Sequence, residues 1–301
     1  MSLLRISILG CLFANVAPLS AQVSINFSYS GSGGFLDASE GAARRAALEA
    51  AAHSLSGYFI DGPSVNLTFA VDSYSADNGT LASASSPIYF SSEDTGFFQT
   101  VVQKKITGGP DDNNAASDGN VNWNWHYDWS LSGAVGEEQF DLATTAKHEL
   151  LHAMGFASMV SEPGTNNGRL QWTVFDSYLV DVNGNALISS TGSWLGRDSA
   201  LTNGGLFFGG ANAVAANGGF LVPLYSPASW EAGSSGSHLD ISGDWLIMNA
   251  YINPGEGPDA LSAIELGMLQ DLGYDVSAIP EPGSVMFLLG GGVIFLRRRK
   301  R

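Results

Sequence analysis

The stretch 148-HELLHAMGF-156 decides how this chain is interpreted. Because an α-helix turns once in 3.6 residues, His148 and His152 project from the same face, one turn apart. Two imidazoles placed in this way can hold one Zn²⁺ through ring nitrogens, and Glu149 beside them can act as a general base on a metal-bound water. The pattern therefore predicts a zinc hydrolase with one catalytic Zn²⁺.

The flanks of this motif predict a helix over residues 141–154. Apolar residues recur there at helical spacing: Leu142, Ala146, Leu150 and Met154. Asp141 can cap the first turn, and Gly155 can end the helix because glycine readily adopts the left-handed conformation. The alternative is a surface helix that carries two histidines by chance, and the helix signals on both sides make it the weaker interpretation.

Both ends of the chain are expected to be targeting segments. Residues 1–21 contain Arg5, an apolar run and the small pair Ser20-Ala21, which is the pattern of a secretory signal peptide cleaved after Ala21. Residues 279–301 contain Pro280-Glu281-Pro282, an apolar run over 285–296 and a basic cluster over 297–301. This run of 12 residues is shorter than the ~20 of a spanning helix, although the basic cluster follows the positive-inside pattern.

These three features, in this order, resemble the PEP-CTERM sorting tail of Gram-negative bacteria. The resemblance implies export through the inner membrane and transient anchoring by the short hydrophobic, transmembrane-type helix of the tail. It also implies an exosortase-type enzyme that removes the tail. The protein would then reside at the cell surface, in the outer envelope or in the extracellular matrix. An ordinary C-terminal membrane anchor is the alternative.

Residues 22–278 remain, and they are long enough for one domain with a substantial core. Without the targeting segments, only seven Lys and Arg are left in a chain that has 29 Asp and Glu. This acidic balance disfavours nucleic acid and anionic membranes as partners. The only cysteine, Cys11, lies in the signal segment, so the mature protein has no disulfide and no cysteine ligand for a metal.

Hydrophobic patterning predicts an α+β fold with an N-terminal mixed sheet, helices, the motif helix and an irregular C-terminal lobe. Strands are expected over 23–29, 65–74, 86–90 and 121–131. Helices are expected over 38–55, 97–106, 141–154 and 259–272. The segments 175–182 and 186–188 flank Asn183-Gly184-Asn185, which is a hairpin signal. Residues 196–237 are rich in Gly, Asn and Ser and have few helix signals.

A catalytic zinc usually takes three protein ligands, so the helix leaves one to be found. In the long metzincin motif the third ligand lies ten residues after the first, where this chain has Ser158, a poor zinc ligand. His53 in the Ala-rich helix and His126 in the Trp-rich strand are interpreted as ordinary residues. Glu162 and Asp176 stay open as carboxylate ligands, although Glu162 follows the helix closely and Asp176 is expected in a strand.

A different third ligand comes from a family resemblance. His238 lies in the small-residue loop 233-GSSGSHLD-240, and Met248 follows it ten residues later. A histidine in such a loop, followed by a lone methionine, resembles the third ligand and Met-turn of metzincins. The long separation of His238 from the helix motif resembles the leishmanolysin-like arrangement.

The resemblance covers about residues 120–275 and implies a zincin-like catalytic domain over 22–278. It implies that the ligands of Zn²⁺ are three histidines: His148, His152 and His238. Glu149 would be the base, and Met248 would form the apolar floor of the site. Leishmanolysin-like enzymes are rich in cysteine, so this chain is expected to be a distant bacterial cousin.

Three weaker signals accompany the motif. Oxygen ligands suited to Ca²⁺ occur twice: Asp111, Asp112, Asn113, Asn114 and Asp118, and then Asp181, Asn183 and Asn185. Neither group has the spacing of a calcium loop, and turn formation explains both equally well. Trp123, Trp125 and Trp129 could line a substrate cleft with Tyr127, although core packing is the commoner role. Tyr251 lies three residues after Met248, where some metzincins have a catalytic tyrosine at two.

The sequence thus predicts a secreted zinc endopeptidase of metzincin type that acts on protein or peptide substrates. The alternative is a non-catalytic surface or matrix protein on a zincin scaffold, since proteins with this kind of tail are often matrix components. The intact His148, Glu149 and His152 favour the enzyme, because a degenerate scaffold has no need of the base.

Overall fold

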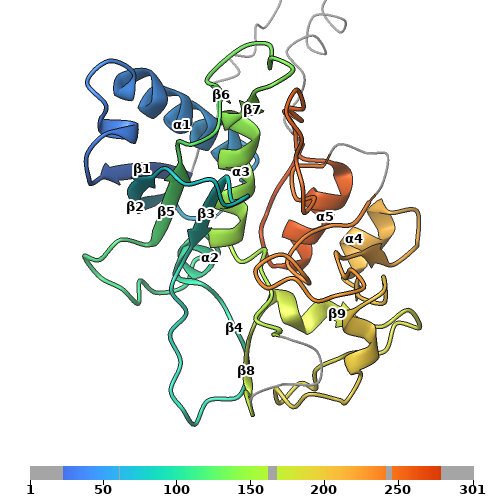
Figure 1. The fold of residues 1–301 in the computed structure, drawn as a ribbon. Helices are drawn as coiled ribbons and strands as arrows, with labels where there is room; N and C mark the ends of the chain where they lie inside the picture. Colours follow the sequence, from blue (N-terminus) through green and yellow to red (C-terminus); the bar gives the residue numbers. More distant parts are fainter. Residues whose placement is uncertain (1–22, 61, 162–167, 242–245, 279–301) are drawn as a thin grey trace, which may run out of the picture.

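Figure 1 shows the computed structural model, which describes residues 23–60, 62–161, 168–241 and 246–278. A four-stranded mixed sheet forms its N-terminal half, in the order β1-β2-β5-β3. The strands β1 (Val23–Tyr29) and β5 (Gly119–Asn124) run parallel to β2 (Val65–Tyr74) on either side of it. At the edge, β3 (Ala82–Ser85) pairs antiparallel with β5. The fold is α+β, and the predicted mixed sheet is confirmed.

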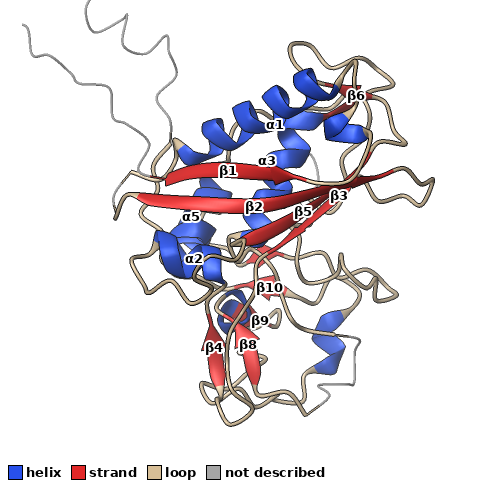
Figure 2. Cartoon of the chain, turned by 90° about the vertical axis from the view of Figure 1, so that its left-hand side faces the viewer, coloured by secondary structure: helices blue, strands red, loops and turns tan. Residues whose placement is uncertain are grey.

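Two long helices lie together on one side of this sheet (Figure 2): α1 (Gly41–Ser56) and α3 (Leu142–Ala153). Alternation in β2 buries Leu67, Phe69 and Val71 almost completely. These side chains belong to one hydrophobic core that continues into the C-terminal half. Because α3 packs against α1 as well as against β3 and β5, the sheet determines where its motif lies.

The ends of α3 follow the sequence signals. Asp141 accepts a hydrogen bond from the Thr144 backbone N–H at 2.9 Å, which satisfies one of the free donors of the first turn. Gly155 follows the helix with a φ of 90°, a conformation that glycine adopts without steric cost. The prediction of a capped helix over this motif is confirmed.

Two strand predictions are wrong. Residues 86–90 form no strand, because Pro87 has no N–H for a ladder, and the small residues of β3 just before it pair instead. The Trp-rich strand ends at Asn124 rather than continuing to 131. The buried Asn124 side chain accepts the N–H groups of Ala76 and His126, which turns the chain. Pairing resumes in the short β6 (Trp129–Ser130) with β7 (Phe140–Asp141).

The predicted helices form at the expected places, but each predicted range begins before the helix does. The first helix begins at Gly41 because Asp37 accepts the N–H groups of Ser39 and Glu40 in a turn before it. The second, α2 (Val101–Ile106), is capped by Thr100, and β4 (Gly96–Phe98) takes the residues before it. The last, α5 (Ala263–Asp271), is capped by Ser262.

The chain after α3 contains short elements joined by turns. Its strands are β8 (Gln171–Thr173), β9 (Leu179–Val180), β10 (Phe207–Phe208) and β11 (Val222–Pro223). Pairing links β8 to β4 and arranges the others in the order β11-β10-β9. The sequence missed α4 (Ala211–Ala216), which packs on α5 where Gly267 allows close approach: a Cβ there would lie 2.8 Å from the Asn212 carbonyl oxygen.

The hairpin predicted around Asn183-Gly184-Asn185 is only partly correct. Residues Phe175–Tyr178 form a 3-10 helix instead of a strand, and pairing is limited to a bridge between Val180 and Ala186. Two more 3-10 helices cover Gly34–Leu36 and Asp198–Leu201.

Neither targeting segment can be compared with its prediction in this structure. The signal peptide over 1–21 and the tail over 279–301 lie outside the described residues. Within the described ranges, every helix is too short or too polar to cross a membrane.

Candidate metal centre

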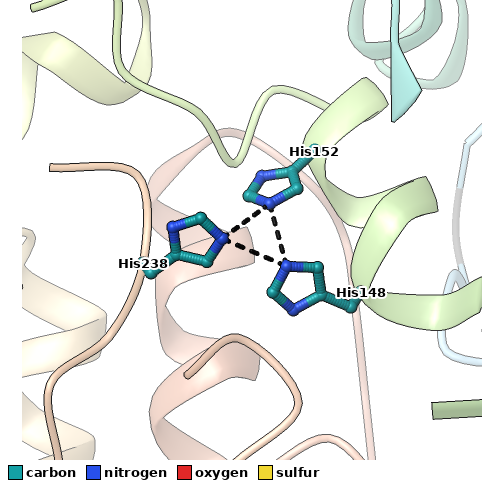
Figure 3. A group of neighbouring side chains, drawn as sticks. All are labelled: His148, His152 and His238. Atoms are coloured by element: carbon teal, nitrogen blue, oxygen red, sulfur yellow. Dashed lines mark hydrogen bonds between the residues drawn. The ribbon is translucent and has the colours of Figure 1, made fainter. Parts of the chain in front are cut away.

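The structure brings three histidines from two distant segments to one point. His148 and His152 come from α3, and His238 comes from the loop before the bridge at Leu239 (Figure 3). Their Nε2 atoms form a triangle with sides of 3.0 Å, 3.1 Å and 3.1 Å. Three nitrogens that each lie 2.0–2.1 Å from a tetrahedral Zn²⁺ would be about 3.3 Å apart, so the triangle has nearly the size that zinc requires.

The other ring nitrogen of each histidine faces a backbone carbonyl oxygen. His148 Nδ1 lies 2.7 Å from Ile247 O, His152 Nδ1 lies 2.7 Å from Phe156 O, and His238 Nδ1 lies 2.8 Å from Ser234 O. A carbonyl oxygen only accepts, so each Nδ1 carries the proton of the neutral ring. Each Nε2 is then an acceptor, and three lone pairs converge with no proton between them. This arrangement could hold a cation.

The protonation state of these rings supports the same conclusion. Burial, together with the neighbouring His238, lowers the pKa of His148 to about 3. Burial and the adjacent histidines place the pKa of His152 well below its ordinary value, and burial also lowers that of His238. All three rings are therefore neutral near pH 7, which is the form that binds metals.

Glu149 is the buried acidic group next to this triangle. It points into the same cleft as the histidines, and only 7% of it is exposed. Burial raises its pKa to about 8, although a hydrogen bond from the Ala84 backbone N–H opposes the shift. A carboxylate with such a pKa takes up a proton readily near neutral pH.

The cleft that contains these four groups has a volume of about 680 Å³. One wall is the sheet edge, formed by β3 and the preceding residues 79–81. The opposite wall is formed by residues 232–234 and 249–252. Its lining is mostly small and uncharged, so the histidines and Glu149 are its principal chemical groups.

Met248 lies in the segment directly behind the histidines, and its side chain is fully buried. The preceding residue, Ile247, supplies the carbonyl for His148, and Met248 O accepts the N–H of Leu239, which follows His238. The methionine predicted as the floor of the site thus lies on a loop that touches both segments that carry the histidines.

The alternative third ligands are not in this group. Both oxygens of Asp176 are occupied: one accepts from Ser158 Oγ, and the other accepts from the N–H groups of Met159 and Thr173. Glu162 lies outside the described residues. In the ranges that the structure describes, only the three histidines gather as potential metal ligands. His53 and His126 are exposed at other places, as expected for ordinary residues.

The acidic groups considered for Ca²⁺ have partners within the protein. Lys105 Nζ lies 2.8 Å from Asp118 Oδ1 and 3.2 Å from Asp111 Oδ2, and Lys104 pairs with Asp112. Asp181 accepts the N–H groups of Asn183 and Asn185, which is the turn role. In the first group, the lysine ammonium groups next to the carboxylates oppose the binding of a further cation.

The aromatic residues divide between the core and the cleft. Trp123 and Trp129 are buried, with ring centroids 4.8 Å apart, so core packing is the role of this pair. Tyr127 and Tyr251 line the cleft. The hydroxyl of Tyr251 lies 2.8 Å from that of Tyr225 and donates to Glu231 at 2.7 Å.

Sequence reasoning missed the groups that orient the histidines. Ile247, Phe156 and Ser234 act through backbone carbonyls, which leave no signal in the sequence. It also missed Glu265, a buried carboxylate behind Met248. The pattern 262-SAIE-265 could have marked Glu265 as a helix-capping residue, although not as a partner of Met248.

Comparison with known proteins identifies the C-terminus. Residues 278–301 match the PEP-CTERM protein-sorting motif. This match implies export, attachment to the cell envelope of a Gram-negative bacterium and processing by an exosortase-type enzyme. No curated protein matches the chain. The match covers only the tail and does not identify the function of the remaining residues.

Proposed function

We propose that this protein is a secreted zinc-dependent endopeptidase with a zincin-like catalytic domain of metzincin type. One observation carries the proposal: three histidine Nε2 atoms converge in a cleft that a buried glutamate also lines. His148, His152 and His238 would be the ligands, and Glu149 would be the general base.

The chemistry of the ligands favours zinc over the harder cations. Imidazole nitrogens suit Zn²⁺, whereas Mg²⁺ and Ca²⁺ take oxygen ligands. A site with three protein ligands also leaves a coordination position open, which is typical of catalytic rather than structural zinc. Backbone carbonyls on all three Nδ1 atoms hold the rings in the tautomer that zinc requires.

Zinc, when bound, would supply Lewis-acid chemistry that polarises the scissile carbonyl and the attacking water. Glu149 accepts the proton of that water and then donates it to the leaving amine. Burial raises the pKa of Glu149 above that of an ordinary carboxyl group, which strengthens it as a proton acceptor. Helix α3 carries Glu149 together with His148 and His152, and all three line the same cleft.

The edge strand gives a reason to expect a peptide substrate. β3 is paired on one side only, and Ala82, Ser83 and Ala84 line the cleft. An extended peptide can add to such an edge through backbone hydrogen bonds that do not depend on its sequence. Because Ala84 also hydrogen-bonds Glu149, a peptide held along β3 would pass close to the base.

The proposal is tested with the protein of residues 22–278, which lacks both targeting segments. Metal analysis should find about one zinc per chain, and casein cleavage should stop on chelation and return with added zinc. Glu149→Gln should retain zinc because Glu149 is not a ligand, while its turnover should fall about 10²–10⁴-fold. Turnover near the wild-type rate in this variant would contradict the mechanism.

A non-catalytic envelope protein is the second candidate, and the sorting tail is the observation that favours it. It predicts a protein that binds zinc and cleaves neither casein nor gelatin. The same measurements therefore separate the two candidates.

A further inference from the structure

Glu265 has an environment that is unusual for a helix-capping residue. It lies in the first turn of α5, where its carboxylate accepts the backbone N–H of Ser262 at 2.7 Å in a capping box. Residues in this position commonly face solvent, because a cap satisfies donors at a helix end. Glu265 is instead 0% exposed. A buried carboxylate of this kind needs further partners to offset its desolvation.

Those partners lie on the loop behind the histidines. Oε1 of Glu265 accepts the N–H of Met248 at 2.7 Å, and the carboxylate also accepts a backbone hydrogen bond from Ile247. The carboxylate thus joins the start of α5 to two successive residues of a turn. Ile247 and Met248 belong to neither a helix nor a strand, so their own backbone pattern does not hold them in place.

The same turn contacts both segments that carry the histidines. The carbonyl of Ile247 lies 2.7 Å from His148 Nδ1, and the carbonyl of Met248 accepts the N–H of Leu239 at 2.8 Å. Leu239 follows His238 directly. A displacement of this turn would therefore rotate the His148 ring and shift the loop of His238.

We propose that Glu265 is a positioning residue for the metal centre. Through Ile247 and Met248 it orients the carbonyl that holds His148 in the Nδ1–H tautomer, and it sets the distance between His148 and His238. The inference rests on the proposed zinc site. Groups that orient metal-bound histidines typically change metal affinity about 10–100-fold when they are replaced.

Glu265→Gln tests this role because it preserves size and removes one acceptor. The carboxylate faces backbone N–H groups through both oxygens, so the amide NH₂ of glutamine would meet a donor on one side. Zinc affinity, measured by competition with a chromophoric chelator on the mature protein, should fall about 10–100-fold. The visible spectrum of the Co²⁺-loaded variant should also shift, because the ligand geometry changes.

Ser262→Ala is the matched control. It removes the hydroxyl that accepts the Glu265 N–H at 3.1 Å, and it leaves both the Ser262 backbone N–H and Met248 in place. This variant should lower the melting temperature and leave zinc affinity and the Co²⁺ spectrum unchanged. If Glu265→Gln does not fold, Glu265→Asp, which keeps both oxygens and shortens their reach, takes its place with the same expected direction.

The outcomes separate this inference from the proposed function. A wild-type protein that binds no zinc would overturn the metal centre and the role of Glu265 together. Wild-type zinc binding with unchanged affinity in the folded Glu265 variant would overturn only the positioning role. Equal losses of affinity in the Glu265 and Ser262 variants would reduce Glu265 to a helix cap.

Discussion

On one side of the cleft, His148 and His152 stand on α3, a regular helix that packs against α1 and the sheet. On the other side, His238 lies in a loop of small residues, and the described residues from 224 to 249 form only isolated bridges and turns. The helix holds its pair through a repeating backbone pattern. The loop has no such pattern, and other groups have to bind its backbone.

In the chain after α3, carboxylates bind the backbone N–H groups that no helix or sheet satisfies. Asp176 binds the N–H groups of Met159 and Thr173, Asp271 binds those of Asn212 and Ala213, and Glu265 binds that of Met248. One charged side chain can satisfy several backbone donors that no ladder reaches. Residues 22–278 contain no cysteine, and these contacts hold the segments of the irregular lobe together.

The largest effect on zinc binding should follow from removing His238, the histidine in the irregular loop. His238→Ala should lower zinc affinity by more than about 100-fold and abolish casein cleavage, because a first ligand contributes more than the groups that orient it. His53→Ala and His126→Ala, both exposed, should change neither quantity. Full zinc content in the His238 variant would show that the helix side binds the metal with a different partner.

A smaller effect should come from a carboxylate that holds the irregular lobe. Asp176→Ala leaves buried donors of Met159 and Thr173 without an acceptor, and should lower the free energy of unfolding by about 3 kcal/mol. In calorimetry this corresponds to about 6–12 °C in melting temperature. Asp181→Ala, which affects an exposed turn, should lower the melting temperature much less than Asp176→Ala does. Equal shifts for the two variants would contradict the comparison.

The three histidines should destabilise the zinc-free protein in acid. Folding lowers the pKa of the three histidines, that of His148 to about 3, so the unfolded chain binds more protons once the pH falls below about 6.5. Their contribution is complete above that pH and is lost as the pH falls towards 3. Glu149, whose pKa is raised to about 8, acts in the opposite direction between about 8 and 4.5, and so do Asp176 and Glu265, whose pKa values are raised by burial.

Melting temperatures of the chelated protein between pH 8 and pH 4 measure this dependence. The difference between the wild type and His148→Asn isolates one histidine, and it should narrow as the pH falls below about 6.5. A difference that does not vary with pH would mean that His148 keeps its ordinary pKa.

The smallest effect on stability is expected for a substitution on helix α3. Thr145 is buried on α3, and its hydroxyl has no hydrogen-bond partner among the residues that the structure describes. Thr145→Val replaces the hydroxyl with a methyl group of similar size, at nearly equal helix propensity. It should raise the free energy of unfolding by about 1 kcal/mol in the absence of substrate. A lower melting temperature would instead show that the hydroxyl is bonded in solution.

Local patterns in the sequence predicted the regular side well. The strand over 65–74 and the helix that carries His148 depend on periodicity and capping, which neighbouring residues determine. The strand expected over 86–90 does not form because Pro87 has no N–H for a ladder, and α4 was not predicted because its position depends on packing against α5. Propensity is a weak guide where tertiary contacts decide the structure.

In the candidate site, the helical pattern alone placed His148 and His152 on one face, because a helix fixes the direction of side chains one turn apart. It also placed Glu149 between them along the chain. A family resemblance suggested His238. Only the tertiary structure brings His238 Nε2 to 3.1 Å from the other two and places Ile247, Met248 and Glu265 behind them. The hydrogen bond between His148 and a backbone carbonyl 99 residues later depends on the folded path, and no local pattern encodes that path.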